Sequence, residues 1–75
     1  MTWNHTKEKY MESWNNNEYN IVIKLYQTNR ANWEVSLGQG SYGSYLLIKT
    51  KGFPSKPMAK KQVEKLLKKY KNGWM

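Results

Sequence analysis

The chain lacks the residues that most often build cross-linked or reactive sites. Its 75 residues include no cysteine and no aspartate, and only one histidine and one arginine. Without cysteine the chain can form neither a disulfide nor a thiolate metal site. The absence of disulfides is typical of cytoplasmic proteins, and the polar N-terminus has no hydrophobic region of a secretory signal. We therefore predict a cytoplasmic protein.

Long hydrophobic runs are also absent. The longest apolar stretch, Tyr45-Leu46-Leu47-Ile48, is far shorter than the roughly 20 residues of a membrane-spanning helix. The chain is also too short to bury a large core. We predict one domain over residues 1–75 and no membrane span.

Few side chains are available for catalysis. His5, Glu8 and Glu12 would share one face of a helix, but Lys7 and Lys9 lie between them, and a metal site normally has three or four ligands. A solvated face is the better interpretation of that pattern. No serine or threonine has a base partner in the sequence. We predict a protein that is not an enzyme, with no metal, no cofactor and no small-molecule substrate.

Positive charge is concentrated in the last third of the chain. Residues 1–48 carry four basic and four acidic side chains, whereas residues 49–75 carry nine lysines and one acid, Glu64. The whole formal charge of +8 therefore belongs to this last third. Such asymmetry indicates a polyanionic partner.

The spacing of apolar residues predicts an α+β fold, a small two-layer sandwich. Over residues 1–16, apolar side chains recur at helical spacing, which predicts a short N-terminal helix or a mobile arm. Residues 19–50 contain three alternating, β-branched stretches, Tyr19–Gln27, 33–37 and Ser44–Thr50, with short connections. These features predict a three-stranded antiparallel sheet.

Residues 55–71 predict a basic amphipathic helix that packs on the sheet. Ser55 is a good N-cap, Pro57 suits the first turn, and Asn72-Gly73 is a natural C-cap. An apolar stripe runs along one side and lysines along the other. The predicted core comprises Ile21, Ile23, Trp33, Val35, Met58, Val63, Leu66 and Leu67.

The segment Gly38–Tyr45, GQGSYGSY, contains the G-x-G-x-x-G spacing of phosphate-binding loops. A dinucleotide site needs a helix directly after the glycines, but the next residues predict a strand. The segment also resembles the glycine-rich loop of protein kinases, whose catalytic and magnesium-binding aspartates cannot exist in this chain. We interpret the glycines as part of a hairpin whose tip could approach phosphate.

Lysines combined with aromatic residues favour nucleic acid as the partner. Tyr26, Tyr42, Tyr45 and Phe53 occupy positions from which they could stack on bases or sugars. Arginine, the commonest specific contact to guanine, occurs once. Twelve lysines and one arginine therefore predict contacts to the phosphate backbone with weak sequence preference.

Residues Lys49–Lys61, KTKGFPSKPMAKK, are similar to the end of the double-stranded-RNA-binding domain. The resemblance implies a helix–three strands–helix order and phosphate-binding lysines at the start of the last helix. Pro57 stands where that family has a lysine. The arm-binding domains of integrases end in a similar way.

We therefore predict a small nucleic-acid-binding module for DNA or RNA. An alternative is an inhibitor or regulator of the kind found in mobile elements, binding an acidic surface of a partner protein. A further alternative is a helix that lies on a membrane surface. The predicted nucleic-acid-binding residues are Lys49, Lys51, Lys56, Lys60, Lys61, Lys65, Lys68, Tyr42 and Tyr45.

Overall fold

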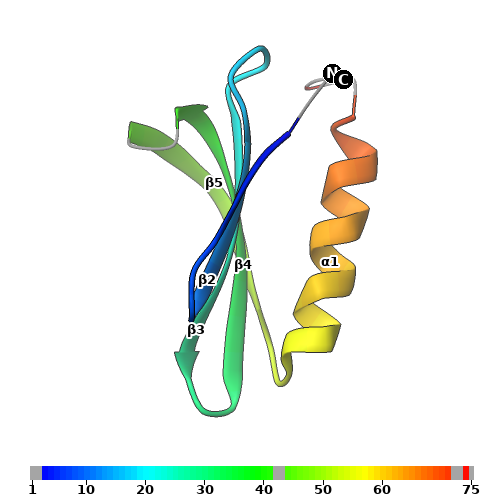
Figure 1. Ribbon diagram of the computed structural model, residues 1–75. Coiled ribbons are helices and arrows are strands. Elements are labelled where there is room, and N and C mark those ends of the chain that lie inside the picture. Colours follow the sequence, from blue (N-terminus) through cyan, green and yellow to red (C-terminus); the bar gives the residue numbers. More distant parts are fainter. Residues whose placement is uncertain (1–2, 42–43, 72–73, 75) are drawn as a thin grey trace.

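The computed structural model describes residues 3–41, 44–71 and 74. Over these residues the chain forms five strands and one helix, arranged as a twisted sheet with the helix on one face (Figure 1). The elements are β1 (Asn4–Lys7), β2 (Met11–Asn16), β3 (Ile21–Asn29), β4 (Asn32–Ser41), β5 (Ser44–Phe53) and α1 (Lys56–Lys69).

The sheet is an antiparallel meander. Its strand order, β1-β2-β3-β4-β5, is the order of the chain, and each strand pairs antiparallel with the next. Short connections allow only this kind of pairing between neighbours. The predicted α+β class with a C-terminal helix agrees with this architecture, but the predicted three-stranded sheet is wrong because there are five strands.

The predicted N-terminal helix over residues 1–16 is also wrong. Residues 4–16 form the hairpin of β1 and β2, in which His5 pairs with Trp14. β2 then pairs with β3 along its whole length, so Trp14 lies opposite Ile23. Tertiary pairing has overridden the helical spacing of the aromatic residues. The helix–three strands–helix order implied by the RNA-binding resemblance is therefore not present.

An asparagine-rich turn joins β2 to β3. The side-chain oxygen of the buried Asn16 accepts hydrogen bonds from the backbone N–H groups of Glu18 (2.9 Å) and Tyr19 (3.3 Å). Asn20 adopts a left-handed backbone with φ of 56°, a conformation that asparagine tolerates better than most residues. These local bonds reverse the chain, so that β2 can pair with β3.

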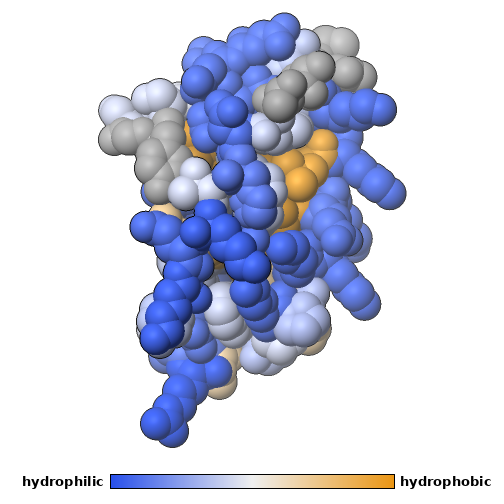
Figure 2. All heavy atoms as spheres, viewed as in Figure 1, coloured by the Kyte–Doolittle hydropathy of each residue, from blue (hydrophilic) through white to orange (hydrophobic). Residues whose placement is uncertain are grey.

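The core lies between the sheet and α1. Ile21, Ile23 and Leu25 alternate along β3 toward the helix, and Val35 and Leu37 on β4 lie opposite Leu25 and Ile23. Three helix residues, Ala59, Val63 and Leu66, complete the cluster together with Trp14 of β2. Figure 2 shows hydrophobic residues mainly between the sheet and α1 on a face that is otherwise hydrophilic.

The predicted core is confirmed at Ile21, Ile23, Val35, Val63 and Leu66, which are all buried. Trp33 and Leu67 are partly buried and pack against the cluster. Met58 was predicted wrongly, since it is 50% exposed. Core residues that the prediction missed are Trp14, Val22, Leu25, Leu37 and Ala59.

The helix begins where the sequence predicts. Ser55 is the N-cap residue, although its side chain makes no capping hydrogen bond, and Pro57 lies in the first turn. The predicted C-cap at Asn72-Gly73 lies outside the described residues. Near the end of the chain, Trp74 packs edge-on against Tyr70, and its indole N–H donates to the carbonyl oxygen of Tyr19 at 2.6 Å.

The glycine-rich segment belongs to a pair of antiparallel strands. Gly38 and Gly40 lie in β4, and Ser41 pairs with Ser44 of β5, which agrees with the hairpin interpretation; Gly43 lies outside the described residues. Gly40 has a φ of +137°, which disfavours any other residue. A side chain at Gly38 would collide with the Tyr45 ring. The glycines thus serve the backbone and the packing of Tyr45.

Candidate nucleic-acid interface

A groove lies between the edge strand β5 and the helix. It consists of two adjoining hollows of about 180 and 250 Å³, which share Lys51 and Gln62 as lining residues. Val35, Leu37 and Leu66 contribute apolar surface to the first hollow. We call it the lysine groove, defined by five of its six polar lining residues, Lys49, Lys51, Lys61, Gln62 and Lys65; the sixth is Thr50.

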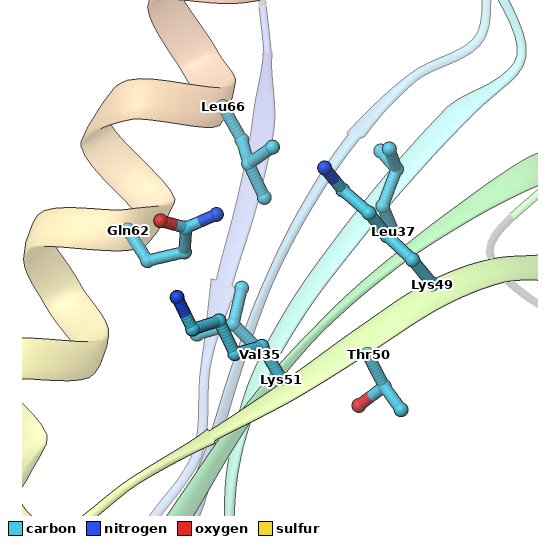
Figure 3. Close-up of a pocket in the computed structure, with 7 residues that line it drawn as sticks. All are labelled: Val35, Leu37, Lys49, Thr50, Lys51, Gln62 and Leu66. Carbon is cyan, nitrogen blue, oxygen red and sulfur yellow. The ribbon is translucent and has the colours of Figure 1, made fainter.

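The pairing of β5 sets the direction of its two lysines. Lys49 lies opposite Leu37 and Lys51 opposite Val35, so both belong to the face that carries the helix. The helix extends over β3 and β4 and contacts β5 less. In Figure 3 both lysine side chains extend toward the space beside α1, whereas Thr50 points away from it.

The other side of the lysine groove is a flank of the helix. Gln62 extends from α1 toward β5 in Figure 3. Lys61 and Lys65, one turn apart, line the second hollow together with Met58 and Phe53. Both lysines are exposed. Four of the predicted phosphate-binding lysines therefore come together from two separate elements.

Two other predicted site residues, Lys56 and Lys60, lie elsewhere. The ammonium group of Lys60 is 3.2 Å from Glu12 Oε1, and that of Lys56 is 3.5 Å from Glu12 Oε2. Each lysine also lies near an aromatic ring, Lys56 near Trp33 and Lys60 near Trp14, with the ammonium nitrogen 5.5 Å from the ring centre in both cases. Both make intramolecular contacts across the sheet–helix interface.

Glu12 is the acidic centre of this second cluster. Its side chain is only 3% exposed. His5 lies flat against Trp14, with its Nε2 atom 3.0 Å from Glu12 Oε1; since a carboxylate can only accept, Nε2 carries the proton in this hydrogen bond. Burial alone would raise the pKa of Glu12. Hydrogen bonds from Lys60 and His5, together with the positive charges of Lys60 and Lys56, outweigh burial and hold this pKa below 4.5.

The remaining predicted residues are not part of the lysine groove. Lys68 is exposed in the last turn of α1 and lines a shallow hollow with Lys61 and Lys65 on the outer helix face. Tyr45 packs over Gly38, and the ammonium nitrogen of Lys24 lies 4.7 Å from the centre of its ring. Tyr42 lies outside the described residues.

Sequence reasoning did not select three residues that line the lysine groove. Gln62 is not among the predicted core or binding residues, Met58 is predicted as core, and Phe53 is predicted only as a general stacking candidate. The spacing offered one signal, since Met58, Gln62 and Lys65 follow one another at steps of four and three along the helix. The strand that this side of the helix approaches could not be read from that spacing.

Other kinds of site find no support in the part of the chain that the structure describes. Residues 3–41, 44–71 and 74 contain no group of three or more potential metal ligands. Within the same ranges, no helix combines the length and hydrophobicity needed to cross a bilayer. Comparison of the chain with known protein families, with curated proteins and with solved structures gives no match.

Proposed function

We propose that this protein is a non-enzymatic nucleic-acid-binding module that holds the phosphate backbone in the lysine groove with weak sequence preference. The observation that supports the proposal is the convergence of Lys49 and Lys51 from β5 with Lys61 and Lys65 from α1. No acidic side chain is among the described residues that line the groove.

Electrostatics favour a polyanion as the occupant. Lysines gathered at one groove repel each other, and a phosphate backbone offsets that repulsion while releasing its counterions. The apolar surface beneath the lysines can contact sugars or bases. Flexible lysines recognise phosphate as point charges and read little sequence. The proposed contact is therefore mainly with the backbone.

A titration with charge-reversal variants tests the groove. The variant K51E/K65E replaces one exposed lysine on each side of it. Duplex DNA, single-stranded DNA and duplex RNA are titrated, with intrinsic tryptophan fluorescence as the readout. For four phosphate contacts, log K should fall with log salt with a slope of about −3.6 on duplex DNA. Loss of two contacts should reduce that slope to about −1.8.

The matched control is K7E/K9E in the N-terminal hairpin. Two lysine-to-glutamate changes of −2 each lower the formal charge from +8 to +4 in both variants. We expect the control to keep the wild-type salt slope, and circular dichroism to show that both variants are folded. Equal loss in the two variants would contradict a site in the groove. If no polymer binds at low salt, nucleic acid is the wrong partner, and an acidic protein becomes the candidate.

A further inference from the structure

The outer edge of β5 is unusual for an edge strand. β5 is the last strand of the sheet, so no other strand among the described residues pairs with its outer side. Three consecutive residues of its first half are well exposed, Leu46 at 72%, Leu47 at 53% and Ile48 at 48%. Proteins usually protect such edges with charge, proline or short length, because a free apolar edge invites another strand.

The opposite edge shows how this sheet protects itself. β1 has four residues, all polar and exposed. β5 has ten residues, and its two lysines, Lys49 and Lys51, lie only in its second half. The first half, residues 44–48, carries no charged side chain. Charged side chains therefore protect only the second half of β5 from pairing with another strand.

We propose that residues 44–48 of β5 pair antiparallel with the same segment of a second copy of this chain. Centred on Leu46, the pairing places each Tyr45 opposite Leu47 of the other copy and joins the two sheets into one. The apolar side chains of both copies become cross-strand neighbours. The open backbone N–H and C=O groups of both edges become paired. One interface therefore covers both kinds of exposed group.

The positions of the lysines favour pairing centred on Leu46 over pairing centred further along β5. Centred on Thr50, an antiparallel pair would place Lys49 of each copy opposite Lys51 of the other, and like charges directly opposite are destabilising. The register of β5 against β4 shifts between Leu47 and Lys49, leaving Ile48 as an extra residue. Such a bulge ends regular pairing and separates the uncharged half from the lysines.

The distribution of charge along β5 also favours a second copy of this chain over an acidic peptide as the partner. An acidic strand would gain from Lys49 and Lys51, but it would place its charges against uncharged residues along the first half of β5. An identical apolar segment has no such mismatch. In Figure 1 the first half of β5 lies away from α1 and the strand then runs toward the helix, so the helix does not cover this half of the edge. Two copies can then meet edge to edge.

Sedimentation without nucleic acid tests the association independently of the proposed function. We expect wild type to populate a dimer as concentration rises to several hundred micromolar. L46K should raise the dimer dissociation constant about tenfold or more, because a charge replaces the central apolar pair. Leu46 is 72% exposed, so the monomer keeps its fold. Y10K is the control, since Tyr10 is 57% exposed outside β5, and it should leave the constant unchanged.

Single-cysteine variants test the register in a chain that has no cysteine of its own. Residues directly opposite in an antiparallel pair have Cα atoms about 4.5–5.5 Å apart, within disulfide range. Under oxidising conditions, at a concentration where wild type populates the dimer, L46C should form a disulfide dimer about tenfold faster than T6C on β1 or T50C, because its partner is held in place.

Three results would overturn the proposal. The first is that the wild-type protein stays monomeric at the highest concentration tested. A monomeric wild-type protein that binds an acidic peptide would overturn the proposal in the same way. Another is cross-linking of T50C or T6C at a rate equal to or above that of L46C. The third is an unchanged dissociation constant in L46K.

Discussion

Glu12 is a buried acid that ties together both ends of the chain. It accepts from His5, seven residues away, and from Lys60, 48 residues away. The carboxylate is almost fully buried, while the lysine side chains are 41% exposed. A buried charge is tolerated only when its partners offset the loss of hydration. Three cationic or donating groups provide that here.

Glu12 should make the protein sensitive to acid. Because the pKa of Glu12 in the folded protein lies below 4.5, the ionised carboxylate adds to the free energy of unfolding above about pH 4.5. That contribution is lost as the pH falls through the folded pKa. E12Q should lose about 1–2 kcal/mol at pH 7 and show a weaker dependence on acid. Urea unfolding at pH 7 and pH 3 measures both effects.

The control for Glu12 is E18Q, since Glu18 is exposed in the turn after β2. E18Q should follow the wild-type acid dependence. An E12Q variant that is as stable as wild type at both pH values would show that the cluster contributes nothing to folding.

At the scale of elements, the β4–β5 pair depends on the contact between Gly38 and Tyr45. Replacement of glycine in a strand by alanine often stabilises a protein by reducing the freedom of the unfolded chain. In this strand the added methyl group would collide with the Tyr45 ring. An aromatic ring over a glycine of the neighbouring strand is a known way of supporting such a position.

G38A should therefore destabilise the protein by about 1 kcal/mol. In a Y45A background the same change should cost nothing or stabilise, giving a coupling energy of about 0.5–3 kcal/mol. A double-mutant cycle by urea unfolding measures this coupling. Additive effects would mean that the ring and the glycine act independently.

The elements also show what can be predicted from this sequence. The helix and the last three strands have strong signals: Pro57 after a good N-cap, apolar residues at helical steps, and β-branched alternation in 21–25. β1 and β2 lack such signals. Their sequences, NHTK and MESWNN, are mostly polar, yet Glu12, Ser13, Asn15 and Asn16 are buried. Their burial depends on strand pairing on both sides of β2 and on contacts with residues of β1, the following turn and the helix, which no local pattern shows.

The candidate site could be predicted only in part from the sequence. Charge asymmetry selected the lysines, but it could not separate those that line the lysine groove from those that contact Glu12. Lys60 and Lys61 are neighbours in sequence, yet Lys60 meets Glu12 while Lys61 lines the lysine groove. The partner of Lys60 is 48 residues away, and no local pattern carries that information.

At the scale of the whole molecule, Trp74 fastens the end of the chain to the β2–β3 turn. Its indole N–H donates to the Tyr19 carbonyl oxygen at 2.6 Å, and its ring packs against the core cluster. W74F keeps most of the apolar contact but removes the donor, leaving a partly buried carbonyl without this partner. We expect a loss of about 1 kcal/mol, measured by urea unfolding.

W3F is the matched control for Trp74. Trp3 also packs against the core cluster, so its replacement by phenylalanine tests the loss of ring size alone. Equal losses in the two variants would indicate that the hydrogen bond to Tyr19 adds no stability.

The strand order of the sheet has a consequence for how the chain folds. Because every strand pairs with its neighbour in sequence, the sheet can grow by closing short loops one after another, and the entropy lost at each step is small. Proteins dominated by such local contacts fold faster than those with distant strand pairs. Glu12 and Lys60 meet across 48 residues, so closing their contact costs more chain entropy than pairing any two neighbouring strands.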